Sequence, residues 1–414
     1  MRHLKIVVFL GSLLAPGVQA QRQSPPSAGP RAVIAASAIF DGAGQTLHNT
    51  RIVVQGTQIA AIDPKAGPVD YDLRGLTVLP GLIDVHAHIT WSFGRDGKNA
   101  GMNRTTQQAA YQSAGNARRT LMAGFTTIQS VGSPADVALR DAIARGEVPG
   151  PRILTAIQGL QGRGEQTGTL DEIRAFVRKQ KEAGADLIKI FASGGMLEGT
   201  MTISQEQLNA ACDEARKQGL RSMVHAYREA VRAAIVAGCT EIEHGLGASD
   251  DDLKLMAERG IYFDPQDGLM VETFLQNKDR YLGTPLFDVD VFAGLARVMP
   301  SHHELLRRAA RVPGLKMVFG TDAVAGTHGR NAEDLIHRVE DGVPPTAALV
   351  SASGLAAASL GMADQIGSIT PKLQADIIAV EGNPLKDMTA LRRVVFVMQG
   401  GIVYKNSRGL SRTY

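Results

Sequence analysis

The sequence has few cysteines and no long apolar segment. Only Cys212 and Cys239 occur among its 414 residues, which excludes a small fold held together by several disulfides. We expect two buried free thiols at these positions, with a single bridge as the alternative. No segment supplies the roughly 20 consecutive apolar residues that a transmembrane helix requires. The sequence therefore predicts no membrane span in the mature protein.

A basic face is also missing. The formal net charge is only +3, and the Lys and Arg residues are scattered among Asp and Glu, which excludes a nucleic-acid partner. With 44% hydrophobic and 21% charged residues, the chain is typical of a globular protein that is long enough for one large barrel and a small second domain. We expect a small-molecule substrate, and the sequence leaves open whether the protein forms a homo-oligomer.

The N-terminus has the pattern of an export signal. Basic residues precede the apolar run 6–14, and Val18 and Ala20 offer small side chains for cleavage. This pattern predicts a signal peptide over 1–20 and a flexible leader over 21–30, with an ordinary buried strand as the alternative. We therefore expect a periplasmic or secreted protein.

The two ends of the folded chain share a β-rich texture. Short runs of alternating or β-branched residues separated by Gly-rich turns fill 31–78 and recur over 371–414. Two β-rich ends around a different middle predict one small β-sandwich domain built from both termini.

The middle, 79–370, alternates strands with amphipathic helices, which is typical of parallel βα units. A helix over 171–183 has one apolar face, and another begins at Ser204 with a capping partner at Gln207. Gly124, Gly184 and Gly238 each precede a strand, where glycine accepts a left-handed turn. We predict an α/β fold, a (β/α)₈ TIM-like barrel, with strands at 78–85, 126–131, 152–156, 187–191, 222–225, 241–244, 262–265 and 317–321.

Four histidines lie at the ends of predicted strands, where barrel enzymes keep their catalytic groups. His86 and His88 follow the first strand, and His225 and His244 end two later ones. A His-x-His pair is a weak motif alone, but residues two apart on a strand point the same way and can reach one ion. Packed or solvent-facing histidines are the alternative.

Two further ionisable residues belong to this set. Lys189 lies inside the apolar strand at 187–191, where an unmodified ammonium would be costly to bury. It either extends to a surface or has lost its cationic character through a metal or a modification. Asp322 ends the last strand and is the natural general base.

These residues resemble the amidohydrolase superfamily, especially its binuclear members related to imidazolonepropionase and the Xaa-dipeptidases. The resemblance covers nearly all of the mature chain, including the split β-domain. It is carried by five stretches: Pro80-Gly81-Leu82-Ile83-Asp84-Val85-His86-Ala87-His88, Ile188-Lys189-Ile190-Phe191-Ala192-Ser193-Gly194-Gly195, His225-Ala226-Tyr227, Ile242-Glu243-His244-Gly245 and Gly320-Thr321-Asp322-Ala323.

The resemblance implies two divalent metal ions, most simply Zn²⁺. One ion would be held by His86, His88 and Asp322, and the other by His225 and His244. Lys189, carboxylated by CO₂, would bridge them, which explains a lysine in an apolar strand. A hydroxide shared by the ions would attack the substrate, with Asp322 as general base and then general acid.

The resemblance also suggests substrate contacts. Tyr227 matches a tyrosine that binds a terminal carboxylate in dipeptidase-like members, and Arg228 is its neighbour. Trp91 and Phe93 could form an apolar wall. Each of these residues has ordinary packing or exposure as its alternative.

One loop departs from the family pattern. Where relatives often carry Gly-Gly-His-Gly, this sequence has Arg163 in the histidine's place, and an arginine can hold an oxyanion but cannot act as an acid or base at neutral pH. His328, in a Gly-rich loop after Asp322, could reach the substrate. His302 and His303 are interpreted as surface residues of a helix within 267–313, a stretch that is only loosely assignable.

The leading functional hypothesis is hydrolysis of an amide bond that frees a C-terminal amino acid, as in exported dipeptidases and in amidases that split ochratoxin-like N-acyl amino acids. A cyclic-amide hydrolase or deaminase of the imidazolonepropionase type, which often uses one ion and no modified lysine, is the first alternative. A non-catalytic secreted metal-binding protein is the second.

Overall fold

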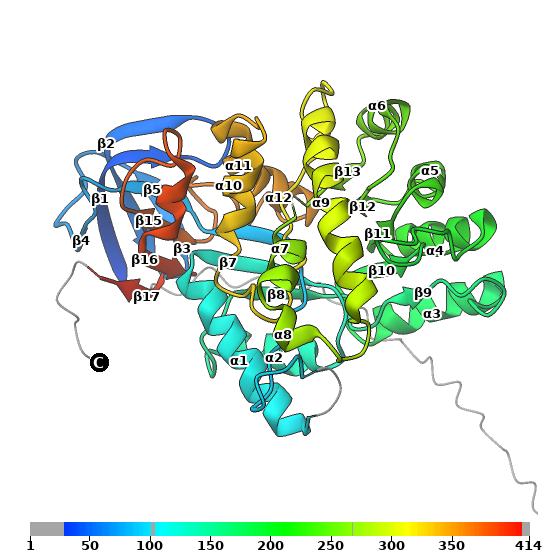
Figure 1. Ribbon diagram of the computed structural model, residues 1–414. Coiled ribbons are helices and arrows are strands. Elements are labelled where there is room, and N and C mark those ends of the chain that lie inside the picture. The colour runs from blue at the N-terminus through cyan, green and yellow to red at the C-terminus, as the bar shows by residue number, and fades with distance from the viewer. Residues whose placement is uncertain (1–28, 101–103, 267, 408–414) are drawn as a thin grey trace, which may run out of the picture.

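The computed structural model describes residues 29–100, 104–266 and 268–407. The predicted signal peptide and nearly all of the predicted leader lie outside these residues. Strands from the two ends of the chain lie together on one side of the molecule, and the helices and strands of the middle form the other (Figure 1).

The terminal strands form one sheet of eight strands in the order β17-β16-β15-β5-β1-β2-β3, with β4 paired to β1. The expected sandwich domain thus takes the form of a single hydrogen-bonded sheet made from both ends. Its two halves join where β15 pairs antiparallel with β5. The strands are β1 (Arg31–Phe40), β2 (Thr46–Gln55), β3 (Gln58–Ile62), β4 (Tyr71–Asp72), β5 (Thr77–Pro80), β15 (Ile377–Val380), β16 (Val394–Gln399) and β17 (Ile402–Asn406), and the 3-10 helix η1 (Met388–Arg392) precedes β16.

Parallel strands form the barrel wall, as the alternating pattern predicts. They pair in the orders β6-β7-β8 and β14-β13-β12-β11-β10-β9. Backbone hydrogen bonds join the two sets: Val85 donates to Phe319 O and Asp186 to Thr155 O, both at 2.9 Å. The strands are β6 (Leu82–Ala87), β7 (Phe125–Ser130), β8 (Arg152–Thr155), β9 (Leu160–Gln161), β10 (Leu187–Phe191), β11 (Arg221–Ala226), β12 (Glu241–His244), β13 (Tyr262–Asp264) and β14 (Lys316–Met317).

Two predicted strands need correction. The strand expected over 78–85 is divided at Gly81, so that its first part, β5, belongs to the terminal sheet and only β6 belongs to the barrel. A Cβ at Gly81 would lie 2.1 Å from Thr126 Oγ1, so the crossing between the two sheets requires glycine. The strand expected over 317–321 is regular only in β14, although its continuation still bonds to neighbouring strands.

Helices cover the outside of the barrel (Figure 1). The capping pair Ser204 and Gln207 begins α4 as predicted. Gly124, Gly184 and Gly238 have φ values of 94°, 84° and 66°, which confirms the predicted left-handed turns. The helices up to the sixth are α1 (Thr106–Met122), α2 (Ala135–Ala144), α3 (Leu170–Glu182), α4 (Gln205–Lys217), α5 (Glu229–Val236) and α6 (Asp250–Arg259). Within the described ranges, no helix has the length and apolarity needed to cross a membrane.

The stretch that the sequence left loosely assigned is helical. It contains α7 (Leu269–Gln276), α8 (Lys278–Tyr281) and α9 (Val289–Ala309), and the later helices are α10 (Ala332–Glu340), α11 (Pro345–Ser351) and α12 (Gly354–Ser359). The surface interpretation of His302 was wrong, because it is 2% exposed. It lies three residues before Leu305 on the packed face of α9. His303 is half-buried, with Nδ1 2.5 Å from Asp341 Oδ2.

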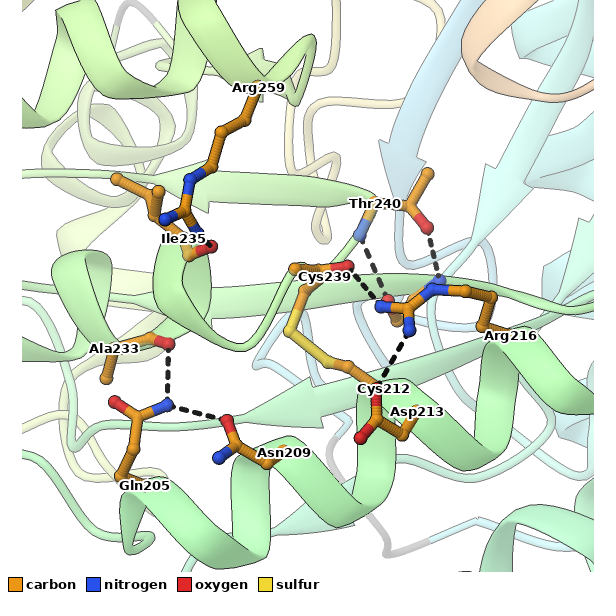
Figure 2. Close-up of a disulfide and its surroundings, with 12 residues drawn as sticks. Gln205, Asn209, Cys212, Asp213, Arg216, Ala233, Ile235, Cys239, Thr240 and Arg259 are labelled. Atoms are coloured by element: carbon orange, nitrogen blue, oxygen red, sulfur yellow. Dashed lines mark hydrogen bonds and ion pairs between the residues drawn. A yellow bond between two sulfur atoms is a disulfide. The ribbon is translucent and has the colours of Figure 1, made fainter.

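The two cysteines form a disulfide, so the expectation of two free thiols was wrong and the alternative is correct. Cys212 on α4 bonds to Cys239, which precedes β12, across 27 residues (Figure 2). Polar contacts accompany the bridge: Arg216 Nη2 donates to Gly238 O at 3.0 Å, and Gln205 Nε2 donates to Ala233 O at 3.1 Å (Figure 2). The bridge and the Arg216 bond tie α4 to the turn that leads into β12, and the Gln205 bond ties α4 to α5.

Candidate active site

The histidines, the lysine and the aspartate predicted from sequence all come from barrel strands or the residues just after them. β6 carries His86 and leads to His88, β10 carries Lys189, β11 carries His225, and β12 ends at His244. Because parallel strands place their carboxyl ends at the same mouth of a barrel, side chains far apart in sequence converge there.

His86, His88 and Asp322 form the first group. Asp322 Oδ1 lies 3.0 Å from His88 Nε2 and 3.4 Å from His86 Nε2. Two atoms bonded at 2.0–2.1 Å to one tetrahedral zinc ion would lie about 3.3 Å apart. The three ligand atoms all lie within 4.8 Å of one another, so the first half of the predicted ligand set has the spacing of a metal site.

His225 and His244 form the second group. His225 Nδ1 lies 2.8 Å from His244 Nε2, and His225 Nε2 lies 3.1 Å from Gly194 O. Because Nε2 of His225 donates to the carbonyl, Nδ1 remains as the nitrogen that can bind a metal. The two groups adjoin, since the rings of His86 and His244 are 5.4 Å apart between centroids.

The Lys189 side chain, on the neighbouring strand β10, is completely buried. No described residue forms a hydrogen bond with its Nζ, which lies 5.4 Å from the centroid of the Phe191 ring. Burial lowers the pKa of Lys189, although the carboxyl groups of Glu243 and Asp322 oppose that change. Because Lys189 is completely buried, the alternative in which its side chain extends to the surface is excluded. A buried, unpartnered ammonium is unfavourable.

Glu243 and Gln266 support the histidines, and the sequence analysis missed both roles. Glu243 Oε2 lies 2.5 Å from His86 Nδ1. Gln266 lies between two rings, with Nε2 2.9 Å from His86 Nδ1 and Oε1 2.8 Å from His244 Nδ1. These contacts leave Nε2 of both imidazoles directed to the ligand cluster. The sequence contained one sign of the role of Glu243, because this residue directly precedes the predicted ligand His244.

A second layer of buried polar contacts lies below. Asp264 accepts hydrogen bonds from Arg338 Nη2 at 2.9 Å and from Gly320 N at 3.0 Å. Asp84 accepts from Thr321 Oγ1 at 2.6 Å and from Asn331 Nδ2 at 2.7 Å. These bonds hold the segment that ends at Asp322 against β6 and β13.

The backbone is strained at the same place. His244, Gln266 and Asp322 have φ values of 65°, 52° and 49°, a left-handed conformation that is uncommon for residues other than glycine. Such conformations gather at functional sites, where the surrounding structure holds them.

The charge states favour metal ligation. Burial, together with the nearby Lys189, lowers the pKa of His225 to about 4 and the pKa of His86 well below its usual value. Burial would raise the pKa of Asp322, but the neighbouring His86 and His88 hold it well below its usual value. Neutral imidazoles and an ionised carboxylate are the forms that bind divalent ions.

The donor set therefore fits metal ions. Asp322 Oδ1 is buried and accepts no hydrogen bond from the described residues, despite the two imidazole nitrogens close to it. A cation held by the same oxygen and nitrogens would satisfy it.

Two of the predicted substrate contacts lie at the cluster. The Tyr227 ring is buried, with its centroid 4.9 Å from that of His225 and 5.0 Å from that of His244. The Trp91 ring lies 5.3 Å from the His88 ring. Both aromatic side chains therefore border the ligands.

The other predicted contacts lie farther out or face elsewhere. Arg163 and Arg228 are exposed, and Arg228 Nη2 donates to Leu197 O at 3.3 Å. Within the described ranges, no hydrogen bond or ion pair joins either guanidinium to the ligand cluster. His328 is buried, and its Nε2 donates to Trp91 O at 3.1 Å. Burial lowers the pKa of His328 to about 3, so its ring is neutral. Their substrate roles stay predictions.

Histidines and an aspartate gathered at the carboxyl mouth of a barrel are typical of metal-dependent hydrolases. Residues 77–405 match the Amidohydrolase family model. The chain therefore belongs to the amidohydrolase family and is an enzyme of that family.

Relatives of known structure and activity agree with this assignment. The chain is 27% identical to ochratoxinase from Aspergillus niger, over 90% of this chain and 86% of the relative. It matches a Xaa-Pro dipeptidase structure with bound methionine at a TM-score of 0.82 and 30% identity, over 91% of this chain and all of that one. A prolidase complexed with N-methylphosphonate-L-proline matches at a TM-score of 0.81 and 26% identity, again over 91% and 100%.

Proposed function

We propose that this protein is an exported binuclear metal-dependent amidase that hydrolyses a dipeptide or an N-acyl amino acid and releases the C-terminal amino acid. The family match shows a hydrolase, and the buried ligand cluster supports its metal dependence. The two-ion centre, its zinc, the carboxylated lysine, the substrate class and the export are the parts that we propose.

The single observation that carries the proposal is the environment of Lys189. Its side chain is completely buried, has no hydrogen-bond partner among the described residues, and influences the pKa values of His86, His225 and His244. Carboxylation would convert this unfavourable cation into an anionic oxygen ligand between the two histidine groups. His86, His88 and Asp322 would hold one ion, and His225 and His244 the other.

A bound pair of divalent ions supplies Lewis-acid polarisation of the amide carbonyl and increases the acidity of a water molecule. Asp322 accepts a proton from the attacking water and returns it to the departing amine, so that water and amide give a carboxylic acid and an amine. Glu243 and Gln266 hold the imidazoles in the orientation that this chemistry needs.

Tyr227 supports the substrate class. Its ring lies against the two histidines of the second group, and burial raises the pKa of its phenol well above the usual value. The phenol therefore stays protonated and can donate a hydrogen bond to a substrate carboxylate. The similarity to a Xaa-Pro dipeptidase with bound methionine and to ochratoxinase supports an amino-acid product.

Export has two supports. The N-terminal sequence has the pattern of a signal peptide, and Cys212 and Cys239 form a disulfide. Disulfides persist in the periplasm and outside the cell, whereas most are reduced in the cytosol.

The test is a hydrolysis assay with purified, metal-loaded protein on a panel of dipeptides and N-acyl amino acids, with free amino acid as the readout. We expect turnover of at least one member and a loss of about 10²- to 10⁴-fold in kcat for Asp322→Asn. Asp341→Asn is the matched control, because Asp341 pairs with His303 and Arg307 away from the cluster.

Absence of any released amino acid across the panel would overturn the substrate class. If only cyclic amides or deamination substrates were turned over, with one ion per chain, the imidazolonepropionase-type alternative would replace it. Metal binding without turnover of any of these substrates would favour the non-catalytic alternative.

A further inference from the structure

A polar cavity lies beside the barrel mouth. It has a volume of about 520 Å³, which lies in the range of small-molecule sites. Side chains from α1, α8 and the loops after β6 and β14 line it. None of the six proposed metal ligands is among the lining residues.

Three arginines contribute to this cavity: Arg119, Arg280 and Arg330. Arg119 donates to Asn116 Oδ1, Arg330 donates to Gln276 Oε1 at 3.0 Å, and Arg280 donates to Gly97 O at 2.7 Å. All three acceptors are uncharged. Within the part of the chain that the structure describes, none of these guanidiniums pairs with a carboxylate, and no Asp or Glu lines the cavity.

This arrangement contrasts with that of Arg338, which is fully buried. Arg338 is paired with both Asp264 and Asp334. Three unneutralised guanidiniums around one cavity repel one another and create a positive potential that an anion would relieve. Guanidiniums bind carboxylates and phosphates through paired, charge-assisted hydrogen bonds.

His328 adds a different requirement. It lines the same cavity and is 7% exposed. Its Nε2 hydrogen is donated to Trp91 O, and its Nδ1 has no hydrogen-bond partner among the described residues. A neutral imidazole with one nitrogen donating presents an acceptor at the other. Nδ1 itself is enclosed by protein atoms. A ligand that satisfies it must therefore carry an O–H or N–H group and shift the side chains that cover this nitrogen.

An aromatic ring holds one of the three arginines in place. The Arg280 guanidinium lies 3.3 Å from the centroid of the Phe93 ring, so it is held in place by a cation–π contact. A guanidinium fixed in this way loses little freedom when it binds an anion.

We propose that this cavity binds a small organic anion, a carboxylate that also carries a hydroxyl or amide N–H, at a site separate from the hydrolytic centre. The arginines bind the carboxylate, and the ligand's O–H or N–H donates to His328 Nδ1. The site needs no metal and does not depend on the proposed amidase activity.

The experiment is calorimetric titration of the full mature protein, with and without metal, using malate, succinate and inorganic phosphate as probes. We expect about one malate to bind per chain in both metal states. Succinate has the same two carboxylates without the hydroxyl and should bind several-fold more weakly. Arg119→Gln and Arg330→Gln should each weaken malate binding at least about tenfold.

Arg118→Gln is the matched control, because Arg118 is an exposed neighbour on α1 that does not line the cavity. It should leave malate binding unchanged. Three results would overturn the proposal: no saturable malate binding, a loss of binding on metal removal, or equal weakening by Arg118→Gln and Arg119→Gln. Phosphate that binds as tightly as malate would overturn the ligand class.

Discussion

The disulfide permits a quantitative prediction, because the bridge closes a loop of known length. Cys212 and Cys239 are separated by 27 residues. In the chain-entropy model, closing such a loop lowers the entropy of the unfolded state by about 12 cal/mol/K, or about 3.5 kcal/mol at 25 °C. We expect removal of the bridge to destabilise the protein by this amount plus a packing loss of about 1 kcal/mol for each deleted sulfur.

The perturbation is a double-mutant cycle of Cys212→Ala, Cys239→Ala and the double variant. Each single substitution breaks the bridge, so the double variant should lose little more than either single one, which is a strong departure from additivity. An unfolding entropy of about 2.1 cal/mol/K per residue over roughly 380 residues converts the loss of about 4.5 kcal/mol in a single variant into a fall in Tm of about 6 °C.

The assay is thermal unfolding followed by circular dichroism, with thiol titration of the denatured, unreduced protein. We expect no free thiol in the wild type and one in each single variant. Hydrolysis of the best substrate at 25 °C should stay near the wild-type rate, because neither cysteine belongs to the ligand cluster. Two free thiols in the wild type, or additive losses for the two substitutions, would show that no disulfide stabilises the fold.

Three other changes test particular contacts. Glu243→Gln should lower metal affinity or activity about 10- to 100-fold, because a neutral amide replaces the carboxylate next to His86 Nδ1. Competition with a chelator measures the metal affinity. An unchanged affinity would show that Glu243 does not support His86. Tyr227→Phe should raise KM about tenfold, because one hydrogen bond to the substrate carboxylate is lost, and kcat should change less. Steady-state kinetics measure both constants, and a fall in kcat alone would contradict this prediction. Gly81→Ala should destabilise the protein by about 1–3 kcal/mol, because the new Cβ would meet Thr126 Oγ1 at 2.1 Å; denaturant unfolding measures this, and an unchanged midpoint would contradict it.

Much of the fold is readable from the sequence because its signals are local. The change from a β-rich texture to alternating strands and helices gives the domain order, and the strand ends place His86, Lys189 and His244 at one mouth. The division at Gly81 is not readable, since a continuous apolar run hides the point where one sheet gives way to another.

The support of the site depends on long-range contacts that a single sequence does not show. Gln266 contacts His86 across 180 residues, and no local pattern pairs them. His302 could have been placed correctly, because it shares the helical spacing of Leu305 and Leu306. The disulfide needed the structure, since two cysteines 27 residues apart meet only when α4 and the turn before β12 pack together.

We propose that the histidine cluster, together with Lys189 and Asp322, holds the metal ions on which amide hydrolysis depends. The most direct measurement is a titration of chelator-treated protein with Zn²⁺, with bound metal and amino-acid release followed together. We predict that activity returns as about two ions bind per chain, and that His225→Ala abolishes one of the two binding events. Full hydrolysis by metal-free protein, or saturation of activity at one ion with His225→Ala unaffected, would contradict the account.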